Sequence, residues 1–95
     1  MPGQYTQVRS SYDAAEWTQA TATNYDVSAQ TLFVNCKNPT FVSIRSDQTM
    51  TVRFNSTTAP AFTVSANTAF EIEFQFQAMY ITTTTSTAVK VLTTQ

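Results

Sequence analysis

The sequence predicts an all-β fold: a small antiparallel sandwich or jelly roll of about seven strands, preceded by an irregular N-terminal arm. Apolar and polar residues alternate with a period of two through the last two thirds of the 95-residue chain, as in half-buried strands. Turn-forming residues separate these stretches at intervals of roughly 8 to 12 residues. A chain of this length is expected to form one domain with a modest core.

Residues 1–28 show neither a helical nor a strand period. We expect them to form an arm that packs across the domain or onto a neighbouring subunit, because they carry Trp17 and several tyrosines, whereas disordered tails are usually poor in aromatic residues. Asp13 and Glu16 have the spacing of a capping box, which favours one or two helical turns from Asp13. The β-sandwich module is then predicted to span residues 29–95.

Face matching predicts three hairpins, because paired strands must present their apolar residues on the same side. They join residues 40–45 to 49–54, 62–65 to 69–76, and 79–82 to 88–91. Their registers place Ile44 opposite Met50, Val64 opposite Phe70, and Ile81 opposite Val89. A further strand is predicted within residues 30–35. The connection Asn55–Pro60 is the longest polar one, and we expect the chain to change sheets there.

The clearest alternation lies in residues 68–77, TAFEIEFQFQ. It predicts that Phe70, Ile72, Phe74 and Phe76 point inward, and that Glu71, Glu73 and Gln75 point outward. With the other strands, it predicts a core that contains Ile44, Met50, Val52, Phe62, Val64, Ile72, Phe74 and Ile81. Because Gly3 is the only glycine, the loops must use other residues, and Asn67 is suited to a left-handed position.

Composition disfavours several functions. Thr, Ser, Gln and Asn make up 40 residues, against five basic and six acidic ones, so the surface has few charges to oppose association. The basic residues are dispersed, which disfavours nucleic-acid binding. Without histidine and with Cys36 as the single cysteine, the chain is expected to hold no zinc and no internal disulfide. No apolar run is long enough to span a membrane, and no secretory signal is recognisable, so synthesis in a cytoplasm is expected.

No set of residues predicts catalysis, a metal site or a cofactor, and we expect a protein that is not an enzyme. Glu71 and Glu73 are interpreted as a solvated strand face. In the predicted hairpin, Phe41 lies opposite Arg53, either as a cation–π pair or as part of an interface. Trp17 is the third interface candidate. With Tyr12 and Tyr25, it could alternatively form a platform for a sugar ring.

The segment TVRFNSTTAPAFTVSANTAFEIEF, followed by AMYITTTTSTAVKVL, resembles small β-rich virion proteins of tailed bacteriophages, particularly head decoration or cement proteins. The likeness lies in the V-R-F strand, the Asn and Ser turn, the ANTAFEI strand start, and MYI running into V-K-V, and it covers about residues 40–93.

The resemblance implies a structural protein of the virion, made in the host cytoplasm and often trimeric. Such a protein binds the major capsid protein across subunit boundaries and reinforces the shell. A tail, neck or head-fibre component of the virion is an alternative within the same class. The alternative from a different class is a carbohydrate-binding β-sandwich module, in which the three aromatic residues Trp17, Tyr12 and Tyr25 would form the binding platform.

Overall fold

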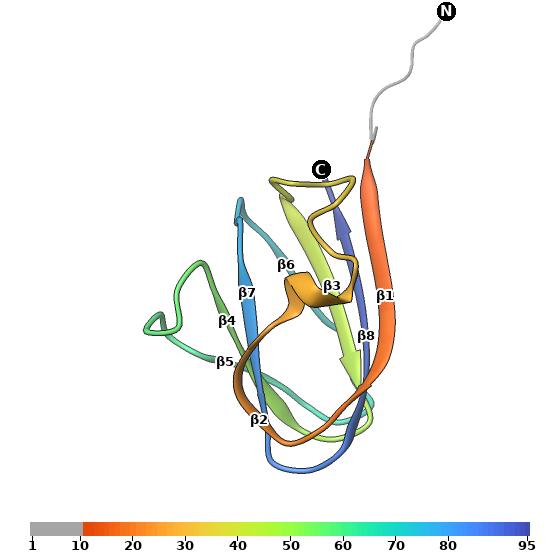
Figure 1. Cartoon of the computed structure of the whole chain (residues 1–95), viewed down its shortest axis with the longest axis vertical. Helices are drawn as coiled ribbons and strands as arrows, with labels where there is room; N and C mark the ends of the chain where they lie inside the picture. The colour runs from red at the N-terminus through yellow and green to blue at the C-terminus, as the bar shows by residue number, and fades with distance from the viewer. Residues whose placement is uncertain (1–10) are drawn as a thin grey trace, which may run out of the picture.

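The computed structural model describes residues 11–95, which form two four-stranded antiparallel sheets (Figure 1). The strand orders are β1-β8-β3-β6 and β2-β7-β4-β5. The elements are β1 (Tyr12–Gln19), β2 (Ala22–Asp26), the 3-10 helix η1 (Val27–Gln30), β3 (Phe41–Ser46), β4 (Met50–Phe54), β5 (Phe62–Val64), β6 (Phe70–Glu73), β7 (Met79–Thr83) and β8 (Thr87–Thr94). The predicted all-β sandwich is confirmed, with eight strands.

The strand order is that of a jelly roll. β1 pairs with β8, β2 with β7, β3 with β6, and β4 with β5, as in one long hairpin folded over on itself. Short connections at the lower end of Figure 1 carry the chain into the opposite sheet after β1, β3, β5 and β7. The connection from β4 to β5 is the tip of the folded hairpin, and it stays within one sheet.

All three predicted hairpins are wrong, because β3 and β4, β5 and β6, and β7 and β8 lie in opposite sheets. Ile44 pairs with Val91 and Phe70 and not with Met50. The two sheets face each other across one core, so apolar residues of consecutive strands point to the same interior whether or not the strands pair. The predicted change of sheet at Asn55–Pro60 is also wrong, because this connection joins β4 to β5 within one sheet.

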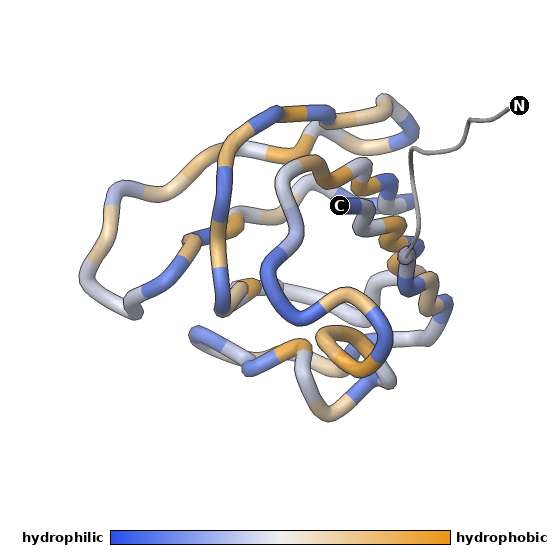
Figure 2. The backbone as a smooth tube through the Cα atoms, turned by 90° about the horizontal axis from the view of Figure 1, so that it is seen from above, coloured by the Kyte–Doolittle hydropathy of each residue, from blue (hydrophilic) through white to orange (hydrophobic). Residues whose placement is uncertain are grey.

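The inward faces were predicted better than the pairing. Nine apolar strand residues are at most 2% exposed and form the centre of the core: Val42, Ile44, Met50, Val52, Val64, Met79, Ile81, Val89 and Val91. Viewed from above, the chain encircles the interior that these side chains fill (Figure 2). Phe62 is 39% exposed, so its predicted burial is wrong. Ile72 and Phe74 are half-buried, because they lie near the open side of the sandwich, and β6 ends at Glu73.

Residues 12–26, predicted to belong to an arm, instead provide an edge strand to each sheet. The predicted helix from Asp13 is wrong, because β1 pairs with β8 at every position from Tyr12 to Gln19. The strand period was hard to recognise because two of the buried inward positions hold Asp13 and Gln19, while the aromatic Tyr12 points outward. Residues 1–10 of the predicted arm lie outside the described residues.

The strand predicted within residues 30–35 is also wrong. The chain forms η1 up to Gln30, and then Thr31 and Phe33 adopt left-handed conformations with φ of 62° and 63°. An extended strand cannot continue through such residues. Elsewhere asparagine takes the left-handed positions, including Asn67 with φ of 58°, which confirms the prediction for that residue.

Candidate binding surfaces

The outward face of the sheet β1-β8-β3-β6 carries rows of side chains whose positions follow from the strand register. The rows are Tyr12, Thr94 and Phe41; Ala14, Leu92 and Ser43; and Glu16, Lys90 and Arg45. Each row runs across β1, β8 and β3, so residues distant in the sequence form one surface. We call this surface the outer sheet face.

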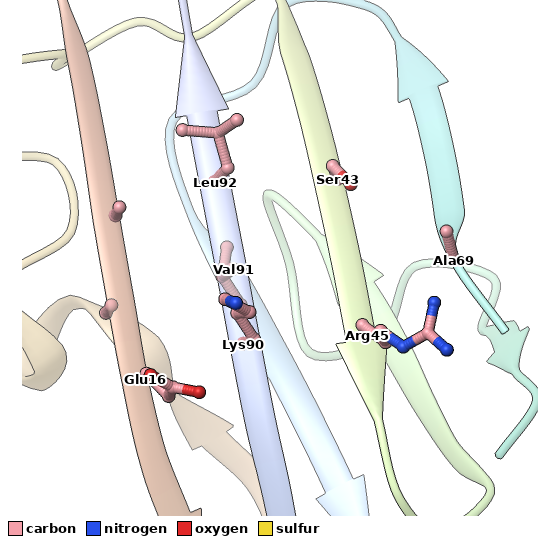
Figure 3. Close-up of a pocket in the computed structure, with 9 residues that line it drawn as sticks. Glu16, Ser43, Arg45, Ala69, Lys90, Val91 and Leu92 are labelled. Atoms are coloured by element: carbon pink, nitrogen blue, oxygen red, sulfur yellow. The ribbon is translucent and has the colours of Figure 1, made fainter. Parts of the chain in front are cut away.

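An open hollow of about 630 Å³ lies on the outer sheet face (Figure 3). Ala14, Ser43 and Ala69 contribute short side chains to its lining, so the floor is low. Leu92 projects from β8 and is 38% exposed. Leu92 thus stands among small side chains. The space around it can accept a protruding side chain of a binding partner, which would then contact Leu92.

Charged groups border one end of this hollow. Lys90 lies between Glu16 on β1 and Arg45 on β3 in the strand register. The Arg45 guanidinium points away from Lys90, because its Nη2 donates a hydrogen bond to the carbonyl of Asn67 at 3.0 Å (Figure 3). The outer sheet face thus combines the apolar Leu92 with Glu16, Lys90 and Arg45 at one end and with the exposed Glu71 and Glu73 along β6.

The structure separates Phe41 from Arg53, and the predicted cation–π pair is wrong. Phe41 is half-buried on the outer sheet face, opposite Glu73 of β6. Arg53 lies in β4 of the other sheet, where its Nε donates to the carbonyl of Ala59 at 2.9 Å and its Nη1 to Oδ1 of Asn24 at 3.1 Å. These bonds connect β4 to the loop that follows it and to β2, so Arg53 has a structural role.

The aromatic residues of the predicted sugar platform do not share one surface. Trp17 is half-buried and packs against the core, and its Nε1 donates to Oε1 of Gln19 at 2.8 Å. Tyr12 is 64% exposed and points to the other side of β1. Tyr25 lies in the opposite sheet, where its hydroxyl accepts a hydrogen bond from Nε2 of Gln30.

A second hollow, of about 730 Å³, lies beside β1 and was not predicted from the sequence. Its lining includes Tyr12 and Val34, which are the two most exposed large apolar residues of the described chain, at 64% and 57%. The adjacent Asp13 carboxylate is only 4% exposed and accepts hydrogen bonds from the backbone N–H groups of Val34, Asn35 and Cys36. Sequence reasoning missed this arrangement because it assigned Asp13 to a helix cap.

Cys36 is itself part of this hydrogen-bonded loop, and its side chain is fully buried. Burial raises the pKa of the Cys36 thiol above its ordinary value of 9.0, and the nearby Asp13 charge raises it further. The thiol is therefore an unreactive core group at neutral pH.

An apolar groove of about 230 Å³ lies on the opposite side of the sandwich, between the edges formed by β5 and β6. Phe54, Phe62 and Phe74 line it together with Ile72. Phe54 contacts the rings of both other phenylalanines edge to face, with centroids 5.9 Å and 4.9 Å apart. Phe62 is exposed because it lies at the open side of this groove.

Comparisons with protein-family models, with curated proteins and with solved structures found no significant match. The class of protein is thus defined by its own geometry, as an eight-stranded jelly roll with an open hollow on one sheet. Across residues 11–95, the His, Cys, Asp and Glu side chains form no group of three suited to a metal ion. The helical segment of this region is four residues long, and no helix there could cross a membrane.

Proposed function

We propose that this chain is a structural protein of a virion, of the decoration or cement type, that binds a protein shell through its outer sheet face. The hollow around Leu92 is the observation that carries the proposal. Apolar side chains at the centre with polar and charged groups at the rim are the usual anatomy of a protein-binding surface. The major capsid protein is the proposed partner.

Two further observations support this function. Jelly rolls recur in viral capsid domains and in lectins, although a fold by itself does not define a function. The sequence of residues 40–93 resembles that of shell-reinforcing phage proteins, and that resemblance implies a homotrimer. Such a protein would act by mass action, because a ligand that binds only the assembled shell stabilises the assembled state.

The carbohydrate-binding alternative has less support. Its platform needs Trp17, Tyr12 and Tyr25 on one surface, and these residues lie on two faces of β1 and in two sheets. A sugar could still be held elsewhere, and jelly rolls include lectins. Retention of the protein on a polysaccharide column would therefore favour this alternative.

Co-sedimentation with phage particles that lack the protein tests the proposal. Wild-type protein should sediment with the particles, and Leu92→Glu should bind at least about tenfold more weakly, because a charge would be buried against the shell. Thr63→Glu is the matched control, since Thr63 is an exposed position in the other sheet, and this variant should bind as the wild type does.

Two results would overturn the proposal. In the first, Leu92→Glu binds the particles as tightly as wild type. In the second, the wild-type protein ignores the particles and is retained on the polysaccharide column. Circular dichroism should show that both variants remain folded, because both positions face solvent in the isolated chain.

A further inference from the structure

β1 is an edge strand whose free side presents unpaired backbone groups. The N–H of Gln95 donates to the carbonyl of Ser11 at 3.3 Å, in line with the register of β1 and β8. Antiparallel ladders alternate, so every second residue after Ser11 bonds to β8 and the intervening ones face away. The outward set is Tyr12, Ala14, Glu16 and Thr18, and among residues 11–95 no strand lies on this side of β1.

We propose that this free edge pairs antiparallel with the same edge of a second copy of the chain. The pairing joins two four-stranded sheets into one continuous sheet of eight strands. It is a two-fold, isologous contact, in which each copy contributes the same residues. The interaction is a form of β-augmentation, in which main-chain hydrogen bonds supply much of the affinity.

β1 is the longest of the four edge strands and the least protected against such pairing, with Glu16 as its one exposed charge. It is eight residues long and contains no proline, no lysine and no bulge. β5 has three residues, and β6 has four, of which two are the exposed glutamates Glu71 and Glu73. In β2 the register shifts between Ala22 and Tyr25. Natural proteins blunt exposed edges with shortness, bulges and several charges, and β1 is long and regular, and the charge of its inward-pointing Asp13 is bonded to the loop of residues 34–36.

The surroundings of this edge also favour a partner. The hollow of about 730 Å³ adjoins the first half of β1 and provides space beside the strand. Tyr12 and Val34 border it, and no other large apolar side chains of the described residues are as exposed. A second strand laid along the edge would cover part of both side chains, which adds apolar burial to the main-chain bonds.

The sequence of β1 selects one register of this pairing. When the two-fold axis passes beside Ala15, Ala14 lies opposite Glu16 of the second copy, and Tyr12 lies opposite Thr18. All four outward residues of each copy then form hydrogen bonds. Moving the axis to Glu16 would place two glutamates opposite each other, which is destabilising. Moving it to Ala14 would place Thr18 opposite residue 10, which lies outside the described strand.

The same pairing would place the outer sheet faces of both copies side by side. Glu16 and Ala14 belong both to the edge and to the hollow on that face, so the two hollows would flank the axis.

A contact made mainly by one strand is small, and we expect association only at high concentration. The resemblance implies three copies, whereas this contact implies two or a multiple of two. The inference depends on the edge of β1 and not on shell binding.

Cysteine cross-linking tests the register. In a Cys36→Ala background, Ala15→Cys places two thiols in a non-hydrogen-bonded pair with Cα atoms about 4.5 Å apart, within disulfide range. The matched variant Ala14→Cys places them more than about 7 Å apart, beyond that range. Mild oxidation should therefore give a covalent dimer of Ala15→Cys only. Failure of Ala15→Cys to cross-link, or equal cross-linking of Ala14→Cys, overturns the proposed pairing.

Sedimentation provides the second test. Ala14→Pro removes an outward N–H and leaves the ladder to β8 intact, so dimerisation should weaken at least about tenfold while the protein stays folded. Ala14→Ser keeps the N–H and should associate as wild type does. Undiminished dimerisation of Ala14→Pro overturns the inference. Leu92→Glu should dimerise as the wild type does, because Leu92 lies on β8 and not on the free edge, so failure of the pairing and failure of shell binding can be told apart.

Discussion

The carboxylate of Asp13 accepts the backbone N–H of Cys36 at 2.8 Å and thereby fastens the connection between the two sheets to edge strand β1. The same carboxylate accepts the N–H groups of Val34 and Asn35. A buried charge is tolerated only with such partners. The contact thus stabilises a loop that contains no regular strand or helix.

Replacing Asp13 by Asn should lower the free energy of unfolding by about 3 kcal/mol, because the new amide group turns a donor toward backbone donors. Asp47→Asn is the matched control. Asp47 is exposed and accepts one N–H, from Ala88, so its replacement should cost about 1 kcal/mol or less. Urea unfolding followed by circular dichroism measures both. Equal losses would contradict the special role of Asp13.

Stability should fall at alkaline pH because of Cys36. Its pKa is raised in the folded state, so the unfolded chain releases the thiol proton first as the pH rises above 9.0. The contribution is therefore fully present below this pH and is lost as the pH rises toward the folded-state pKa. Cys36→Ala should show a shallower decline in urea titrations above pH 9.0. An identical decline in both proteins would show that the thiol does not contribute.

Thr31→Asn should stabilise the fold by about 0.5 to 1 kcal/mol. Thr31 is β-branched and adopts a left-handed conformation, which asparagine tolerates better. Thr57→Asn is the control, since Thr57 is exposed and does not have a positive φ. It should change the free energy of unfolding by less than about 0.5 kcal/mol. Thermal unfolding of the two variants provides the comparison, and a destabilised Thr31→Asn would count against backbone strain.

Ile44→Ala should destabilise the protein by about 3 to 4 kcal/mol, because Ile44 is fully buried and its removal leaves a cavity. Ile72→Ala should cost no more than about 2 kcal/mol, since Ile72 is half-buried beside the open groove, where solvent can enter. Denaturant midpoints of the two variants test this order. The reverse order would mean that the β5 and β6 side is closed in solution.

The candidate site could be predicted only in part from the sequence. Phe41, which the sequence singled out, lies on the outer sheet face. Leu92 and Ala14 define the hollow there, but no sequence pattern marks either residue as part of a site. They become neighbours only through the pairing of β1 with β8, whose residues are about eighty positions apart along the chain. Contacts of this kind depend on topology, which alternating patterns do not encode.

The sequence by itself determined the strand period and therefore which side chains of β3, β4, β7 and β8 enter the core, since a period of two assigns each residue to one face. It also determined that asparagine, and not glycine, would take left-handed positions such as Asn67. The tertiary structure decided which strands pair. In a sandwich both sheets bury their apolar faces against the same interior, so burial alone cannot distinguish a neighbour in one sheet from a neighbour across the core.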